Sequence, residues 1–119
     1  MSAFDGNVSF LNGYLADIST AGQCYIPVPE NIEGDIIEIR SVINGAIGTG
    51  DATLTPKIGG TAVTNGAITV TQSGSAAGDV DVSRPTGART VAAGDAIEIE
   101  TDGASTNTVE VFFTVAILR

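Results

Sequence analysis

The chain has 119 residues, 43% of them hydrophobic, and its 14 acidic residues outnumber five basic ones to give a net charge of −9. This length suits one domain with one core, and the apolar content excludes a disordered chain. The five basic residues form no cluster, so neither nucleic acid nor an anionic membrane is expected as a partner. Thirteen Ile and eleven Val against four Leu favour strands over helices, because branching at Cβ suits a pleated backbone.

The first 21 residues are richer in aromatic side chains than the rest of the chain. Five large apolar residues gather there: Phe4, Phe10, Leu11, Tyr14 and Leu15. The dipeptide Asn12-Gly13 predicts a two-residue hairpin turn between Phe10-Leu11 and Tyr14-Leu15. Because the exposure of aromatic rings to water is unfavourable, we expect residues 1–21 to form an N-terminal arm or hairpin that packs on another surface. It would pack on its own sandwich, on a neighbouring subunit or on a partner.

From residue 22 onward, short apolar segments alternate with turn signals. Strands are expected at 23–28, 35–43, 51–58, 62–63, 67–71, 79–83, 89–91, 96–101 and 108–118. Asn65-Gly66 predicts a tight hairpin between two of them. The pattern predicts an all-β fold, a single antiparallel β-sandwich or jelly-roll-like domain of seven or eight strands over residues 22–119.

Alternation along these segments predicts which side chains face the core. The inward set is Ile37, Ile39, Ile43, Ala52, Leu54, Ile58, Ile97, Ile99, Val109, Val111, Phe113, Val115 and Ile117. The outward set includes the acidic residues Glu38, Asp79, Asp81, Glu98, Glu100 and Asp102. Phe112 is expected to point outward, because its neighbour Phe113 points inward.

The sequence offers no catalytic residue and no cofactor motif. Histidine is absent, which removes His-based nucleophilic and acid–base machinery. Cys24 is alone, so no disulfide forms within the chain, and a reducing cytoplasm is the expected place of folding. No secretory signal and no segment long enough to span a bilayer are recognised. We therefore expect a protein that is not an enzyme and needs no cofactor.

Three carboxylates on one strand face form a weak candidate for calcium. Glu98, Glu100 and Asp102 share the outward parity, and Ca²⁺ prefers oxygen ligands. A solvated strand face is the alternative that we favour, since acids on an outer face also discourage edge-to-edge aggregation.

Several segments resemble small virion proteins of tailed bacteriophages, especially head decoration (capsid cement) proteins. They are Ile36-Ile37-Glu38-Ile39-Arg40, Thr53-Leu54-Thr55-Pro56-Lys57-Ile58-Gly59-Gly60, Val63-Thr64-Asn65-Gly66, Ala92-Ala93-Gly94-Asp95-Ala96-Ile97-Glu98-Ile99 and the terminal strand that ends at Arg119. A Gly-Asp pair before the penultimate strand is also similar to trimeric jelly rolls of the tumour-necrosis-factor type. The resemblance implies a homotrimer that binds the outer surface of the major capsid protein lattice, on a virion assembled in the host cytoplasm.

The expected contact residues for a capsid or a neighbouring subunit are the large apolar ones outside the predicted core. They are Phe4, Phe10, Leu11, Tyr14, Leu15 and Phe112. Two other classes of function stay open. One is a receptor- or glycan-binding module of a head or tail fibre, and the other is a Ca²⁺-dependent adhesion-type sandwich.

Overall fold

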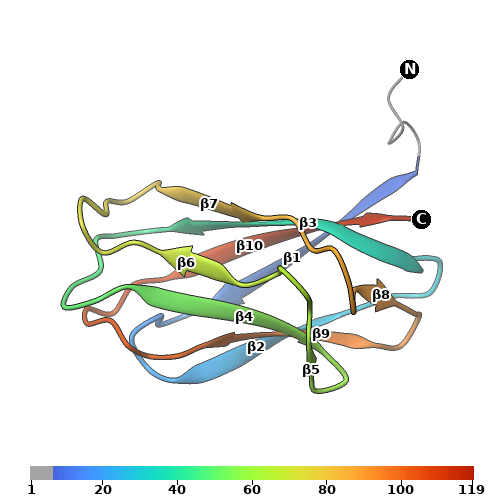
Figure 1. Cartoon of the computed structure of the whole chain (residues 1–119), viewed down its shortest axis with the longest axis horizontal. Coiled ribbons are helices and arrows are strands. Elements are labelled where there is room, and N and C mark those ends of the chain that lie inside the picture. Colours follow the sequence, from blue (N-terminus) through green and yellow to red (C-terminus); the bar gives the residue numbers. More distant parts are fainter. Residues whose placement is uncertain (1–6) are drawn as a thin grey trace.

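A computed structural model describes residues 7–119, which form ten strands and no helix. The strands are β1 (Val8–Leu15), β2 (Gly22–Pro27), β3 (Gly34–Ile43), β4 (Ala52–Ile58), β5 (Thr61–Ala62), β6 (Ile68–Val70), β7 (Val80–Ser83), β8 (Thr90–Val91), β9 (Ala96–Thr101) and β10 (Val111–Leu118). Figure 1 shows them arranged in two layers. In this part of the chain no helix is long and apolar enough to cross a membrane.

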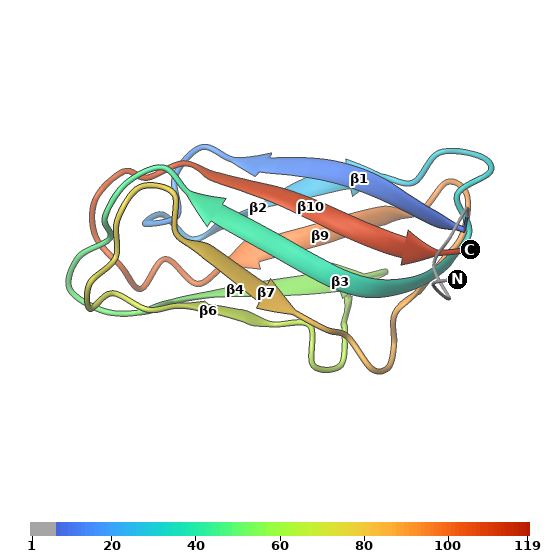
Figure 2. The same cartoon turned by 90° about the horizontal axis from the view of Figure 1, so that it is seen from above.

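Two antiparallel sheets make up the layers. The first has the order β1-β10-β3-β7, with β8 also pairing with β3; the second has the order β2-β9-β4-β5, with β6 also pairing with β4. In Figure 2 the first sheet lies in front of the second. The predicted all-β sandwich is confirmed. It has ten strands rather than seven or eight, because the N-terminal segment supplies β1 and because the short expected segments near residues 62 and 90 form separate two-residue strands, β5 and β8.

The core lies between the sheets and is built mainly from Ile and Val. The alternation predicted for β9 and β10 is confirmed, since Ile97, Ile99, Val111, Phe113, Val115 and Ile117 are all buried. Ile39 and Ile43 of β3 and Ala52 and Leu54 of β4 are buried as predicted, while Ile58 is only half-buried.

Ile37 is an exception to the predicted parity of β3. Ala116 of β10 pairs with Glu38, whereas the next residue, Ile117, pairs with Ile36. The extra residue forms a β-bulge, and a bulge reverses the side on which the following positions lie. Ile36 is therefore fully buried and Ile37 only half-buried, so the expectation that Ile37 faces the core is wrong.

The hairpin predicted at Asn12-Gly13 is also wrong. Strand β1 runs without a turn along β10, from Val8 opposite Leu118 to Leu15 opposite Val111. A Cβ atom at Gly13 would lie 2.5 Å from Cδ1 of Ile26, so this glycine provides space for the second sheet rather than a turn. The boundary predicted between residues 21 and 22 coincides with the start of β2, and its role as a domain limit stays a prediction.

We expect Gly13→Ala to lower the free energy of unfolding by about 1–3 kcal/mol, as overpacking in a well-packed core usually does. The atoms in the way belong to the flexible end of Ile26, so a partial shift keeps the cost in this range. Urea denaturation measures the change. Gly22→Ala is a suitable control, because its nearest contact would be an ordinary 3.7 Å to the carbonyl oxygen of Thr20.

A two-residue hairpin turn lies at Gly59-Gly60, between β4 and β5, and not at Asn65-Gly66, where one was predicted between segments 62–63 and 67–71. Both glycines have positive φ, 58° and 83°, as a type I′ hairpin turn requires. Strands β5 and β6 both pair with β4 and not with each other, so the hairpin predicted at Asn65-Gly66 is wrong. The chain bends there through a turn in which the Gly66 N–H donates to the carbonyl of Val63.

Candidate functional site

The outer face of the first sheet carries apolar side chains from all four of its principal strands. The pairing register places Tyr14, Phe112, Val42 and Val80 in one row across β1, β10, β3 and β7. Together with Phe10 and Val82 these residues form what we call the apolar face. Val42 is half-buried and the other five are exposed, Phe10 by 63%. A row of exposed apolar side chains of this kind is a candidate site of contact with another molecule.

The side chains of β7 face opposite to the usual arrangement in a sandwich, because its apolar side chains point to solvent and its polar ones point toward the core. Val80 and Val82 are 53% and 36% exposed, whereas Ser83 is buried and Asp81 is half-buried. The buried hydroxyl oxygens of Ser41 and Ser83 find no hydrogen-bond partner within residues 7–119. A shift of one residue would exchange the two faces of β7 and place its valines inside. The fold instead holds these valines on the outside, where only contact with another molecule would bury them.

Asp81 differs from the prediction that it faces outward beside Asp79, because its strand turns the carboxylate toward the space between the sheets. Burial, and then the negative charge of Asp79, raise the pKa of Asp81 above its ordinary value of 3.8. The folded state therefore holds this proton more tightly than the unfolded state does, and ionisation of Asp81 opposes folding.

We expect Asp81→Asn to stabilise the protein at neutral pH and to have little effect in acid. The stabilising contribution of protonated Asp81 is fully present below pH 3.8 and is lost as the pH rises through the raised pKa. Urea midpoints of both proteins, measured from pH 3 to pH 7, test this. An Asp81→Asn variant that gains no stability at pH 7 would contradict the inward placement.

Two aromatic rings of the apolar face are held in fixed positions. The Tyr14 hydroxyl donates to Oε2 of Glu110 at 2.6 Å, and the Asn44 amide donates to Oε1 of the same carboxylate at 3.2 Å. These bonds lower the pKa of Glu110, and the bond to Glu110 raises the pKa of Tyr14. The Tyr14 ring lies 5.1 Å from the ring of Phe112. Because the rings are already ordered, a partner that binds them loses less conformational entropy.

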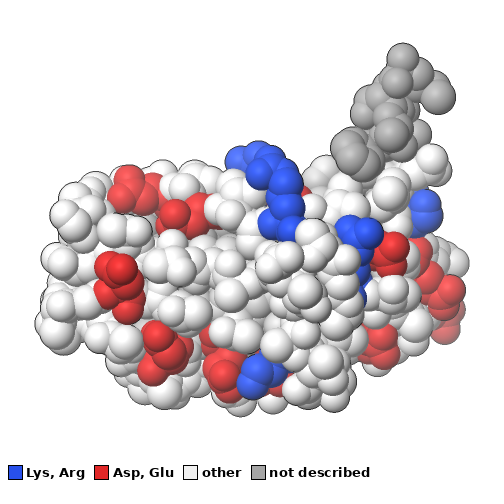
Figure 3. All heavy atoms as spheres, viewed as in Figure 1, with Lys and Arg blue, Asp and Glu red and all other residues white. Residues whose placement is uncertain are grey.

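Cationic side chains border the apolar face. Glu38 accepts a hydrogen bond from Arg40 at 2.6 Å and another from Arg84 at 3.4 Å, so two guanidinium groups share one carboxylate. A notch of about 230 Å³ opens beside Arg40 and is lined by Arg40, Ser41, Val42, Val80, Phe112 and Thr114. In Figure 3 the cationic side chains lie in the upper middle, at the right and at the lower edge, among more numerous acidic ones. The border of the apolar face is therefore mixed in charge, with Arg40 and Arg84 around the Glu38 carboxylate and with Glu110 beside Tyr14.

The outer face of the second sheet is polar by contrast. It presents Gln23 and Tyr25 from β2, Glu98 and Glu100 from β9, and Thr53, Thr55 and Lys57 from β4. Lys57 and Glu100 form an ion pair at 3.2 Å. Tyr25 is the one large exposed aromatic side chain on this face among the described residues. The two faces of the sandwich therefore differ in the kind of surface that they would bind.

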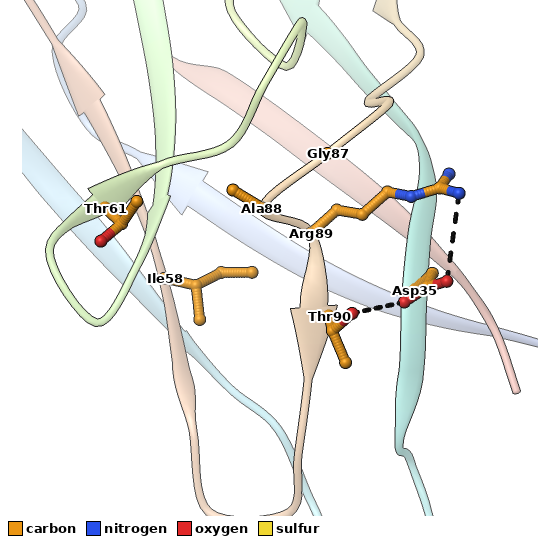
Figure 4. A pocket seen from close by; sticks show the side chains of 7 residues that line it. All are labelled: Asp35, Ile58, Thr61, Gly87, Ala88, Arg89 and Thr90. Carbon is orange, nitrogen blue, oxygen red and sulfur yellow. Dashed lines mark hydrogen bonds and ion pairs between the residues drawn. The ribbon is translucent and has the colours of Figure 1, made fainter.

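A separate cleft of about 360 Å³ lies between the β4–β5 hairpin and the segment that leads into β8 (Figure 4). Its lining residues are Asp35, Ile58, Thr61, Gly87, Ala88, Arg89 and Thr90. Asp35 accepts a hydrogen bond from the Thr90 hydroxyl at 2.6 Å and lies 3.9 Å from the Arg89 guanidinium. The cleft combines donors, a carboxylate and the apolar side chain of Ile58, and no aromatic ring lines it.

The predicted contact residues divide into three groups. Phe10, Tyr14 and Phe112 are exposed together on the apolar face. Leu11 and Leu15 face the core, Leu15 being buried and Leu11 packed against the buried cluster, so they do not offer the exposed surface expected of them. The alternation of β1 is the reason, because odd positions point inward along this strand. Phe4 lies outside the described residues.

The calcium candidate does not come together as a site. Glu100 pairs with Lys57, and the Asp102 carboxylate accepts hydrogen bonds from the backbone N–H groups of Thr53 and Ala104. Glu98 is half-buried and faces outward as predicted. Within residues 7–119 no three His, Cys, Asp or Glu side chains lie close enough to hold a metal ion.

Comparisons with known proteins place the fold. The sequence matches no protein-family model and no curated protein. Its structure is similar to the carbohydrate-binding module CsCBM6-3 from Clostridium stercorarium, solved with cellobiose, at a TM-score of 0.56 and 14% identity over 100% of this chain and 88% of the other. It is also similar to a chain of the cyanophage Pam1 capsid asymmetric unit, at a TM-score of 0.54 and 14% identity over 99% and 89%. At such low identity the similarity shows the jelly-roll-like fold alone.

Proposed function

We propose that this protein is a non-enzymatic structural protein of a phage virion, which docks its apolar face on the outer surface of the capsid protein lattice. The partner surface would be apolar, with carboxylates placed to meet Arg40 and Arg84. The homotrimer that the sequence resemblance implies stays a prediction.

The outward facing of the apolar side chains of β7 is the observation that carries this proposal. The chain buries Ser83 and half-buries Asp81 while it exposes Val80 and Val82, so these valines contribute no hydrophobic stabilisation to the isolated protein. The ordered rings of Tyr14 and Phe112 continue the same surface, and buried aromatic anchors supply much of the affinity at protein interfaces. The similarity to a chain of a cyanophage capsid asymmetric unit shows that this fold occurs in capsids.

Electron microscopy of the native particle tests the proposal. We expect density for this protein on the outside of the shell, with the apolar face turned toward the capsid lattice. Density at a fibre tip, or an apolar face turned to solvent on the assembled particle, would overturn it.

Glycan binding is the second candidate, and the cleft in Figure 4 favours it. The cleft offers the Asp35 carboxylate as acceptor and the Arg89 guanidinium as donor, which suits the hydroxyl groups of a sugar. The carbohydrate-binding module found with cellobiose has the same fold. Binding on a glycan array that is abolished by Asp35→Asn and unaffected by Phe112→Ala would support this function over capsid docking.

A further inference from the structure

We propose that β1 is a contact between two copies of this chain, which pair their β1 strands antiparallel about a two-fold axis at Asn12. The inference rests on the free edge of the first sheet and is independent of the proposed function. It differs from the homotrimer that the sequence resemblance implies, and the mass in solution decides between the two assemblies.

The edge at β1 is open in a way that the other sheet edges are not. Strand β1 ends the first sheet and offers eight residues with no charged side chain and no proline. At the opposite edge, β7 has only four residues and includes Asp81. In the second sheet β2 ends in Pro27, and β5 and β6 have two and three residues. Proteins usually protect long edges with charges, proline or short strands, so an unprotected edge indicates a strand partner.

The free backbone groups of β1 belong to the even-numbered residues. The N–H of Arg119 donates to the carbonyl of Asn7 at 2.9 Å, so Asn7 is bonded toward β10. Bonding alternates along an antiparallel pair, which directs Phe10, Asn12 and Tyr14 to the open side. The N–H of Tyr14 accordingly points away from β10 and lies beside the Cys24 thiol of β2.

A two-fold axis at Asn12 makes this edge self-complementary. It places Phe10 opposite Tyr14 of the partner subunit, and Asn12 opposite Asn12 of the partner subunit. The N–H and C=O groups of these residues point away from β10, so the pairing forms about six hydrogen bonds without disturbing those to β10. The Tyr14 N–H would exchange the Cys24 thiol for a carbonyl of the partner subunit. Phe10 and Tyr14 both lie on the outer face, where an opposed aromatic pair adds to sheet stability. The two first sheets then become one, and their apolar faces are continuous.

Charge sets how the pairing responds to salt. Each chain carries −9, whereas β1 carries no charge, so repulsion acts between the bodies of the two copies and not at the contact. Since salt screens such repulsion, we expect the dimer to tighten as the salt concentration rises.

Analytical ultracentrifugation of the full chain is the first test. We expect a mass of about 24 kDa, twice the 12.0 kDa of one chain. Asn12→Pro removes the N–H at the centre of the contact, which points away from β10, and should weaken association at least about tenfold. Asn12→Ala keeps that N–H and is the matched control. A monomeric or trimeric wild-type protein, or equal association of the two variants, would overturn the inference.

A cross-link keeps the test decisive if Asn12→Pro fails to fold. Opposed residues at a hydrogen-bonded position have Cα atoms about 5.5 Å apart, within the range of a disulfide. Asn12→Cys should therefore form a covalent dimer on oxidation, whereas the wild-type chain with its half-buried Cys24 should not. Absence of this cross-link would exclude the pairing at Asn12. Val80 lies on β7, at the opposite edge of the sheet from β1, so loss of docking in Val80→Ala with the dimer retained separates this inference from the proposed function.

Discussion

Replacing Phe113 with alanine is expected to lower the free energy of unfolding by about 3–5 kcal/mol. Phe113 is 2% exposed and is the largest of the fully buried side chains, on the central strand β10 between β1 and β3. Removal of its ring leaves a cavity in a core of branched side chains that cannot collapse to fill it. A urea denaturation curve with an unchanged slope and a lower midpoint would record this loss.

Phe112 provides a matched control for this effect, because it is the same residue type at the neighbouring position. Its side chain is 46% exposed and contacts the ring of Tyr14 rather than the core. We expect Phe112→Ala to cost less than about 1.5 kcal/mol, the loss of one partly exposed aromatic pair. Equal losses for the two alanine variants would contradict the assignment of opposite faces to Phe112 and Phe113.

Sequence alternation identified the core where strands lie in the interior of a sheet and pair without interruption. It succeeded for β9 and for β10 because both faces of these strands are defined, one by the core and one by solvent. It failed at Ile37, where an extra residue in β3 reverses the parity. No residue type in the segment 36–40 predicts the bulge, because the pairing of β3 with β10 determines where it lies.

Turn signals in the sequence were less reliable than strand patterns. Asn12-Gly13 has the composition of a hairpin turn, but Gly13 is required in mid-strand by the approach of Ile26 from the other sheet. Gly59-Gly60 forms the actual two-residue turn. A dipeptide describes only the local backbone, whereas the position of the opposite sheet is decided by residues far away in the chain.

The candidate site was predictable only in part. Phe10, Tyr14 and Phe112 were expected at an interface because large rings lie outside the predicted core, and all three are exposed. Val42, Val80 and Val82 were missed. The segment Val80-Asp81-Val82-Ser83 alternates clearly, but alternation does not say which side is the core, and acids are normally placed outside. The register with β3 determines which face of β7 is outside, and the sequence of the segment itself does not predict that register.

Loss of two side chains from the apolar face is expected to weaken capsid docking at least about thirtyfold, the effect of removing a hot spot worth about 2 kcal/mol or more. Phe112→Ala with Val80→Ala removes two side chains that line the notch beside Arg40 and leaves the backbone of β1, which would pair the two copies, in place. Both side chains are exposed, so the double variant should remain folded. Co-sedimentation with particles stripped of this protein measures the affinity.

Tyr25→Ala is the control for this experiment, since Tyr25 is as exposed as Phe10 but lies on the polar outer face of the second sheet. If docking depended on exposed aromatic surface in general, both variants would weaken it. If the apolar face alone meets the capsid, only the Phe112 and Val80 substitutions reduce binding. Arg40→Glu should then also reduce it, and more strongly at low salt, because its guanidinium would face a carboxylate of the partner across a partly screened contact. A double variant that sediments with particles like the wild-type protein would remove the physical basis of the proposed function, whatever the mass of the free protein.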